Sequence, residues 1–155
     1  MDLTLLQSVL ARPLNEIPDL PKYEVPPPGV LRFLVQKIGT KTINDKPVLA
    51  FDFIQTKVVS MGDPNATPLA DGALFGESFF FGDQESVDKT LSVLKAKFGA
   101  CAAQLGNENM DLLELIGKLE GMELQGTIKN RTDKNDATKV YPSVHDCMIA
   151  TDAVQ

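Results

Sequence analysis

The chain has 155 residues, of which 43% are hydrophobic, and a formal net charge of −6 at pH 7. This size and composition predict one domain with a core of its own, not a disordered chain. No segment approaches the roughly 18 apolar residues that span a bilayer, and residues 1–4 lack the positive charge of a secretory signal. With two cysteines, no CxxC spacing and one histidine, we expect neither a disulfide framework nor a metal site. The sequence therefore predicts a cytoplasmic protein without a cofactor.

Charge is distributed unevenly along the chain. Residues 29–60 carry five basic side chains against two acidic ones, a local charge of +3, whereas residues 61–121 carry ten acids against four lysines, a local charge of −6. The negative total argues against a nucleic-acid partner, but binding depends on where the positive charge lies. An ordinary solvated surface explains the same pattern equally well.

The N-terminal residues 1–28 are predicted to form a helix and a proline-rich arm. Apolar residues in 3–11 fit a short amphipathic helix, which Pro13 interrupts. Six prolines in residues 13–28 favour an extended segment. That segment is either a strap across the domain, which we favour, or an arm that reaches a partner subunit. Residues 29–150 form the predicted domain, and residues 151–155 a short tail.

Alternating apolar and polar residues predict three strands, at 30–38, 48–59 and 74–81. The connecting segments 39–47 and 61–73 are rich in turn-forming residues and are predicted to be loops. The second strand is long and its inward face is ambiguous. Strands of this length often carry a β-bulge that changes the inward side, and we expect one here.

A helical period then replaces the strand period. A first helix, capped by Asp83 or Ser86, has the predicted core stripe Val87, Leu91, Leu94 and Phe98. Gly99 ends or bends it, or Cys101 and Leu105 prolong the stripe. A second helix, capped by Asn109, is predicted to point four side chains inward: Leu112, Leu113, Ile116 and Leu119. Two further strands, at 122–131 and 140–150, are joined by a loop at 132–139.

The order of elements is β-β-β-α-β-β, in which strands and helices do not alternate as they do in a parallel sheet. Five antiparallel strands with helices between the third and fourth are typical of the OB-fold. The sequence therefore predicts a mainly β domain with inserted helices, built as a five-stranded antiparallel OB-like barrel.

Residues typical of catalysis are not found in a catalytic arrangement. His145, the single histidine, is followed by Asp146, and neighbours on a strand point to opposite faces. The chain has neither a phosphate-binding loop nor a nucleophile elbow. Acidic pairs such as Asp111 and Glu114 fit a solvated helix face better than a metal pair. We expect a protein that is not an enzyme.

An OB-fold binds its ligand across strands two and three, between the loops that join strands one to two and four to five. Basic side chains lie in or beside these segments: Arg32, Lys37, Lys41, Lys46, Lys57, Lys129, Arg131, Lys134 and Lys139. Three rings are candidates for base stacking: Phe53, Phe80 and Tyr141. The alternative for each phenylalanine is a place in the core, and Asp133 and Asp136 reduce the positive charge of the second loop.

Three features carry a resemblance to a known family: the proline-rich lead-in to Pro28-Gly29, the sequence Lys46-Pro47-Val48 that opens the second strand, and the helical run 111–118 before the strand 121–131. Over residues 20–150 this layout resembles the bacteriophage single-stranded DNA-binding proteins and related phage OB-fold families. The resemblance implies protection of single strands during replication or recombination, by homodimers or cooperative arrays in the host cytoplasm. Many members end in an acidic tail, whereas residues 151–155 carry one acid, so recruitment through such a tail is not expected.

The expected function is therefore sequence-tolerant binding and protection of single-stranded DNA, with neither a membrane nor a small-molecule substrate as partner. The alternative is a protein–protein interaction module on the same barrel, such as a phage structural or host-inhibiting protein. The acidic middle of the chain and the proline-rich arm favour this alternative.

Overall fold

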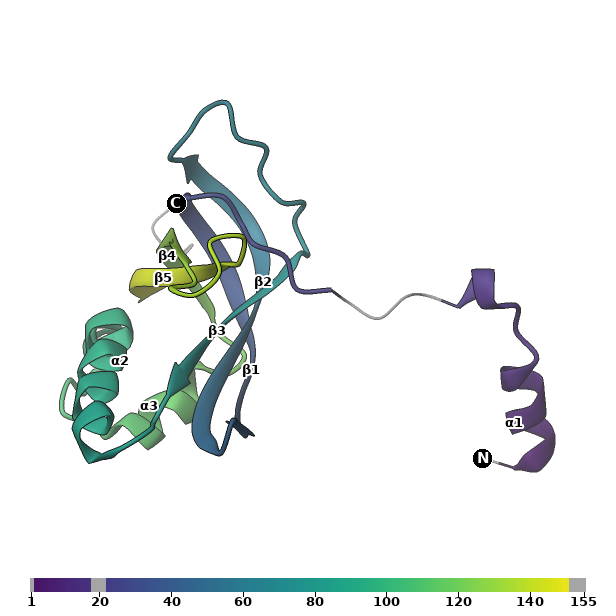
Figure 1. Ribbon diagram of the computed structural model, residues 1–155, viewed down its shortest axis with the longest axis horizontal. Coiled ribbons are helices and arrows are strands. Elements are labelled where there is room, and N and C mark those ends of the chain that lie inside the picture. Colours follow the sequence, from purple (N-terminus) through teal and green to yellow (C-terminus); the bar gives the residue numbers. More distant parts are fainter. Residues whose placement is uncertain (1, 18–21, 151–155) are drawn as a thin grey trace.

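The computed structural model describes residues 2–17 and 22–150, so the predicted tail lies outside the described residues. These residues form α1 (Leu3–Leu10), η1 (Leu14–Glu16), β1 (Gly29–Ile43), β2 (Lys46–Met61), β3 (Leu74–Phe80), α2 (Gln84–Gln104), α3 (Leu112–Leu119), β4 (Glu123–Thr132) and β5 (Val140–Ile149). The strands make one five-stranded antiparallel sheet in the order β3-β2-β1-β4-β5 (Figure 1). The predicted mainly β architecture, with helices between the third and fourth strands, is confirmed.

The β1–β2 hairpin is longer, and its turn tighter, than the sequence predicted. Ile43 pairs with Lys46, which leaves Asn44 and Asp45 as the turn, with φ of 51° and 64°. A two-residue turn with positive φ at both positions matches the twist of the flanking strands, and Asn and Asp tolerate that conformation. The predicted loop at 39–47 is therefore wrong, because all but its two turn residues belong to β1 and β2.

The β-bulge predicted for the second strand is present. The pairing of β1 with β2 shifts register between Arg32 and Phe33, where β2 carries an extra residue. Before this point along β2, Phe53 and Gln55 are buried; after it, Val58 packs against the core. The bulge therefore moves the inward side of β2 by one residue and resolves the ambiguity in its sequence pattern.

Aromatic rings fill the space between the sheet and α2. The rings of Phe51 and Phe98 are stacked, with centroids 4.9 Å apart, and those of Phe33 and Phe53 meet edge to face at 4.8 Å. Such pairs contribute beyond the area they bury. Because Phe98 belongs to α2 and the other three rings to β1 and β2, this cluster fixes the helix against the sheet.

The helices differ from their predictions in several details. Of the two candidate caps of α2, Asp83 is the N-cap, and Ser86 completes a reciprocal capping box with it. The helix continues through Gly99 to Gln104, so the alternative with the longer stripe is the correct one. Leu91 is 39% exposed, so the predicted core stripe is wrong at this position. The true stripe is Leu94, Lys97, Phe98, Cys101 and Ala102. In α3 the cap is Asp111 instead of Asn109, and Leu113 points outward with 81% exposure.

The proline-rich segment lies on the sheet as a strap, defined here as residues 22–28. Tyr23 forms a parallel bridge with Leu74 of β3, and the Glu24 amide donates to the Leu74 carbonyl at 2.8 Å. Further along, the carbonyl of the buried Pro26 accepts from Asn130 Nδ2 at 3.1 Å. The strap thus contacts β3 and β4, whereas α1 has no buried residue and stands away from the sheet (Figure 1).

The contrast between Phe98 and Leu91 gives a stability prediction. Phe98 is 1% exposed, so Phe98→Ala leaves a cavity and should lower the free energy of unfolding by ~3–5 kcal/mol. Leu91→Ala, on the same helix, removes a partly solvated side chain and should cost less than ~1 kcal/mol. Urea unfolding followed by circular dichroism measures both values. Equal losses in the two variants would contradict the observed orientation of α2.

Candidate functional site

A groove of about 1250 Å³ crosses the outer face of β2 and β3. Its floor includes Asp52 and the alternate residues Gly76 and Ser78, which lie between inward-pointing side chains of β3. The strap bounds it through Tyr23, and the segment 131–142 of β4, β5 and their connecting loop contributes further lining. The groove therefore lies where elements that are distant in sequence meet.

Six of the predicted site residues line this groove: Lys41, Lys46, Phe80, Arg131, Lys134 and Tyr141. Lys41 and Lys46 come from the end of the β1–β2 hairpin, although from its strands and not from a loop. Phe80 is 42% exposed and Tyr141 40%, so both rings are accessible to a flat ligand. The fold thus brings cations from two segments that are distant in the sequence next to two exposed rings.

Phe53 is not a surface residue, and its predicted stacking role is wrong. Its side chain is 0% exposed. The ring packs against Phe33 and Phe75, with centroid distances of 4.8 and 5.2 Å. Phe53 is also the register partner of Phe75, so both side chains point into the core from neighbouring strands. The core alternative holds for this residue.

The other predicted cations do not line the groove: Arg32, Lys37, Lys57, Lys129 and Lys139. Arg32 is the register partner of Lys57, and its Nε donates to Gln125 Oε1 at 3.2 Å. The remaining three are exposed side chains elsewhere on β1, on β4 and in the loop before β5.

The β4–β5 end of the groove is built around a cross-strand pair. Arg131 and Tyr141 are register partners, and the guanidinium carbon lies 5.8 Å from the centre of the tyrosine ring. The Asp133 carboxylate accepts from the Asn135 amide at 2.8 Å, which lowers the pKa of Asp133. Hydrogen bonds from Thr138 lower the pKa of Asp136 in the same way. These acids, which were expected only to dilute positive charge, shape the loop that presents Lys134.

The charge of the groove opposes that of the whole chain. Four cations line it (Lys41, Lys46, Arg131 and Lys134), and its carboxylates other than the ion-paired Glu77 are those of Glu24, Asp52 and Asp133. Asp52 accepts from the Tyr23 hydroxyl at 2.6 Å, and this bond to a carboxylate raises the pKa of Tyr23 to about 12. The groove is therefore slightly positive on a chain whose net charge is −6.

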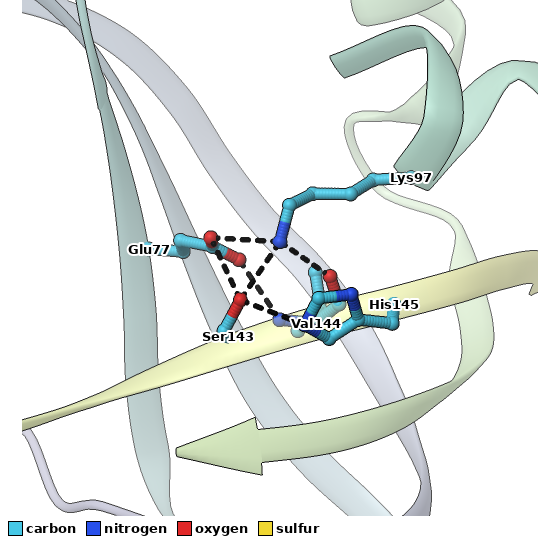
Figure 2. A network of polar contacts seen from close by, with 5 residues as sticks. All are labelled: Glu77, Lys97, Ser143, Val144 and His145. Carbon is cyan, nitrogen blue, oxygen red and sulfur yellow. Dashed lines mark hydrogen bonds and ion pairs between the residues drawn. The ribbon is translucent and has the colours of Figure 1, made fainter. Parts of the chain in front are cut away.

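Figure 2 shows a buried polar network, which reaches the groove through Glu77. Lys97 Nζ from α2 donates to Glu77 Oε2 at 3.0 Å, to Ser143 Oγ at 2.8 Å and to the Val144 carbonyl at 2.7 Å. Glu77 Oε1 on β3 accepts from the Val144 amide at 2.9 Å. Both backbone groups of Val144 on β5 are thus bonded to side chains. Within the described residues, β3 and β5 are the two edges of the sheet and do not pair with each other. The network links the two edge strands.

In this network Ser143 lies within hydrogen-bond distance of both Lys97 and His145. The three donors of Lys97 are engaged by three acceptors, so its nitrogen has no lone pair directed at Ser143. His145 Nε2 lies 3.0 Å from Ser143 Oγ. Burial, with a smaller contribution from Lys97, lowers the pKa of His145. The ring is therefore a neutral hydrogen-bonding partner at pH 7.

Sequence reasoning did not identify Glu77 and Lys97, although both left a signal. Glu77 alternates with Phe75 and Phe79 at an inward position of β3, and Lys97 falls between the buried positions 94 and 98 of α2. A charged residue at a core position requires a buried partner of opposite charge. Two residues of opposite charge at inward positions therefore predict a buried ion pair, and the sequence alone is enough to find them.

Within residues 2–17 and 22–150, no three His, Cys, Asp or Glu side chains gather in a way that would hold a metal ion. Across the same ranges, no helix is both long and apolar enough to cross a membrane.

Breaking the buried ion pair should be costly. Lys97→Met leaves the Glu77 carboxylate without its cation, and we expect the free energy of unfolding to fall by ~3–5 kcal/mol. The double variant Glu77→Leu/Lys97→Met removes both charges and should regain a large part of this loss. Urea unfolding of the three proteins measures the effect. A double variant as unstable as Lys97→Met would contradict the pairing.

Stability should also depend on the protonation of His145. Its folded pKa lies below the ordinary value of 6.5, so the unfolded chain binds the proton more strongly. The free energy of unfolding should therefore fall as the pH drops below ~6.5, towards the folded pKa. The charged groups that act on the ring are Lys97, Glu77, Lys129 and Asp146. In urea titrations between about pH 7.5 and 5.5, His145→Gln should lose stability less steeply than the wild type; parallel curves would contradict this.

Comparison with known proteins completes the description of the site. No protein-family model matches the chain, and no curated protein matches it significantly. What the groove binds must therefore be inferred from its own residues and their geometry.

Proposed function

We propose that the protein binds and protects single-stranded DNA, with little sequence preference, in the groove over β2 and β3. The observation that carries this proposal is the gathering of four cations and two exposed rings, Phe80 and Tyr141, in one groove. Cations that neutralise phosphates release counterions, which drives binding. Exposed rings stack on bases of any sequence. The combination suits a strand whose bases are unpaired.

The strand order supports the use of this sheet as an OB-like barrel. The order β3-β2-β1-β4-β5 is that of a closed OB barrel opened between the third and fifth strands, and OB barrels are partly open. The Glu77 carboxylate accepts hydrogen bonds from the Ser143 hydroxyl and the Val144 amide, which join those two edges. In an OB-fold the ligand crosses strands two and three between two loops, and the groove occupies the corresponding place.

The layout of the sequence supports the same role. The features that resemble the bacteriophage single-stranded DNA-binding proteins, the lead-in to Pro28-Gly29 and the opening of β2 at Lys46, border the groove or lead to it. Protection of single strands during replication or recombination, in the cytoplasm of a host cell, is the setting that this role implies. Four cations that neutralise phosphates would make the binding weaken as the salt concentration rises.

Fluorescence anisotropy of a labelled oligonucleotide of about 25 nucleotides tests the electrostatic part of the proposal. Lys41→Glu/Lys134→Glu should weaken binding at least ~10-fold at low salt and make its salt dependence less steep by ~2 in the log–log slope. Lys95→Glu/Lys118→Glu, on exposed positions of α2 and α3, changes the net charge equally and is the matched control. No binding by the wild type at low salt, or equal loss in both double variants, would overturn the proposal.

The aromatic part has a different signature. Phe80→Ala and Tyr141→Ala should each weaken DNA binding by ~1–3 kcal/mol. Neither should change how steeply the affinity depends on salt concentration, because a stacked ring contacts no phosphate. The same anisotropy titrations, repeated at three salt concentrations, separate the two effects. Unchanged affinity in both variants would exclude stacking in this groove.

A further inference from the structure

Helix α1 exposes an apolar surface that no other part of residues 2–17 and 22–150 buries. Its residues Leu3–Leu10 include no charged side chain and no buried one. Leu3 is 78% and Leu10 72% exposed, and Leu14, just beyond the helix, is 87% exposed. A helix of eight residues is marginal in water and gains most of its stability from packing an apolar face. The helix therefore requires an apolar surface to cover it.

A matching surface lies at the far end of β3. A depression of about 230 Å³ opens between the β1–β2 hairpin and α3. Its lining includes Leu49, Phe81, Leu112, Leu113 and Ile116, and no lining residue is charged. Leu113 is 81% exposed at its rim. We call this depression the α3 pocket.

We propose that α1 of one copy of this chain docks in the α3 pocket of a second copy. The two surfaces match in chemistry, because each is apolar and uncharged, whereas the groove over β2 and β3 is lined by charged side chains. The segment between α1 and the strap is also long enough for the helix to reach beyond its own domain. Twelve residues separate Leu10 from Tyr23, and such a segment spans at most ~40 Å.

The position of the strap favours a second copy over the helix's own pocket. The strap meets β3 at Leu74, whereas the α3 pocket includes Phe81, beyond the opposite end of that strand. Gly76, Ser78 and Phe80, which lie between these ends, line the groove. If the helix turned back along β3 into its own pocket, the segment that connects it to the strap would cross the groove. Exchange between copies leaves both grooves open. This step rests on the proposed function.

Exchange of α1 between copies can produce either a closed dimer or an open chain of copies. Two copies that insert α1 into each other form a closed dimer with two identical contacts, and copies that each insert into the next form an open chain. Both arrangements use the same α1–pocket contact. An open chain would also align successive grooves along one strand of DNA.

Sedimentation velocity of the full chain, without nucleic acid, tests the contact. The wild type should associate, and Leu6→Asp/Leu10→Asp in α1 or Leu113→Asp in the pocket should weaken association at least ~10-fold. Thr4→Asp, which adds a charge to α1 without removing an apolar side chain, is the control and should associate as the wild type does. The two defective proteins, when mixed, should form a 1:1 complex, because one supplies an intact helix and the other an intact pocket.

A monomeric wild type, association that survives in Leu113→Asp, or a mixture that stays monomeric would each overturn the proposal. Because the experiment contains no DNA, its failure is distinct from failure of the proposed function. Anisotropy with Leu113→Asp separates the two further: a monomer that still binds DNA shows that the groove acts alone.

Discussion

The ion pair between Glu77 and Lys97 is the contact on which the rest of the arrangement depends. The pair joins β3 to α2, and the hydrogen bonds of the same two side chains reach β5, the opposite edge strand of the sheet. Burying two charges costs solvation free energy, and here the cost is offset by bonds to Ser143 and to both backbone groups of Val144. Because Glu77 also lines the groove, the pair fixes the floor on which a ligand would lie.

Local placement of charge, more than its total, determines what this surface can attract. The chain is acidic, with a net charge of −6, yet several acids are engaged within the fold. Glu77 is neutralised by Lys97, Asp52 is bonded to Tyr23, and Asp133 is bonded to the amide of Asn135. The cations of the groove have no such role in the interior, and their charge remains directed at solvent.

The sequence pattern predicted the five strands and the place of the helices between the third and fourth, because strand period and turn composition are local properties; of the twelve predicted site residues it placed six in the groove. It failed where a side chain's direction depends on distant contacts. The inward face of Phe53 was ambiguous because the bulge that sets it is fixed by pairing with β1. Leu91 fits the helical stripe as well as Leu94 does, but the position of α2 on β5 selects the other side. The turn at Asn44 and Asp45 lacks the glycine that usually marks so tight a hairpin.

The two cysteines give the protein a chemical reporter of its own packing. Cys101 lies on α2 and Cys147 on β5, both buried, with Cys101 Sγ 3.5 Å from the carbonyl oxygen of Cys147. Burial raises the pKa of both thiols, that of Cys101 to about 11, so neither is a reactive thiolate while the helix is in place. Alkylation by a thiol reagent therefore requires α2 to separate from the sheet. Its rate would follow that opening without an added label, in the purified protein or in a cell.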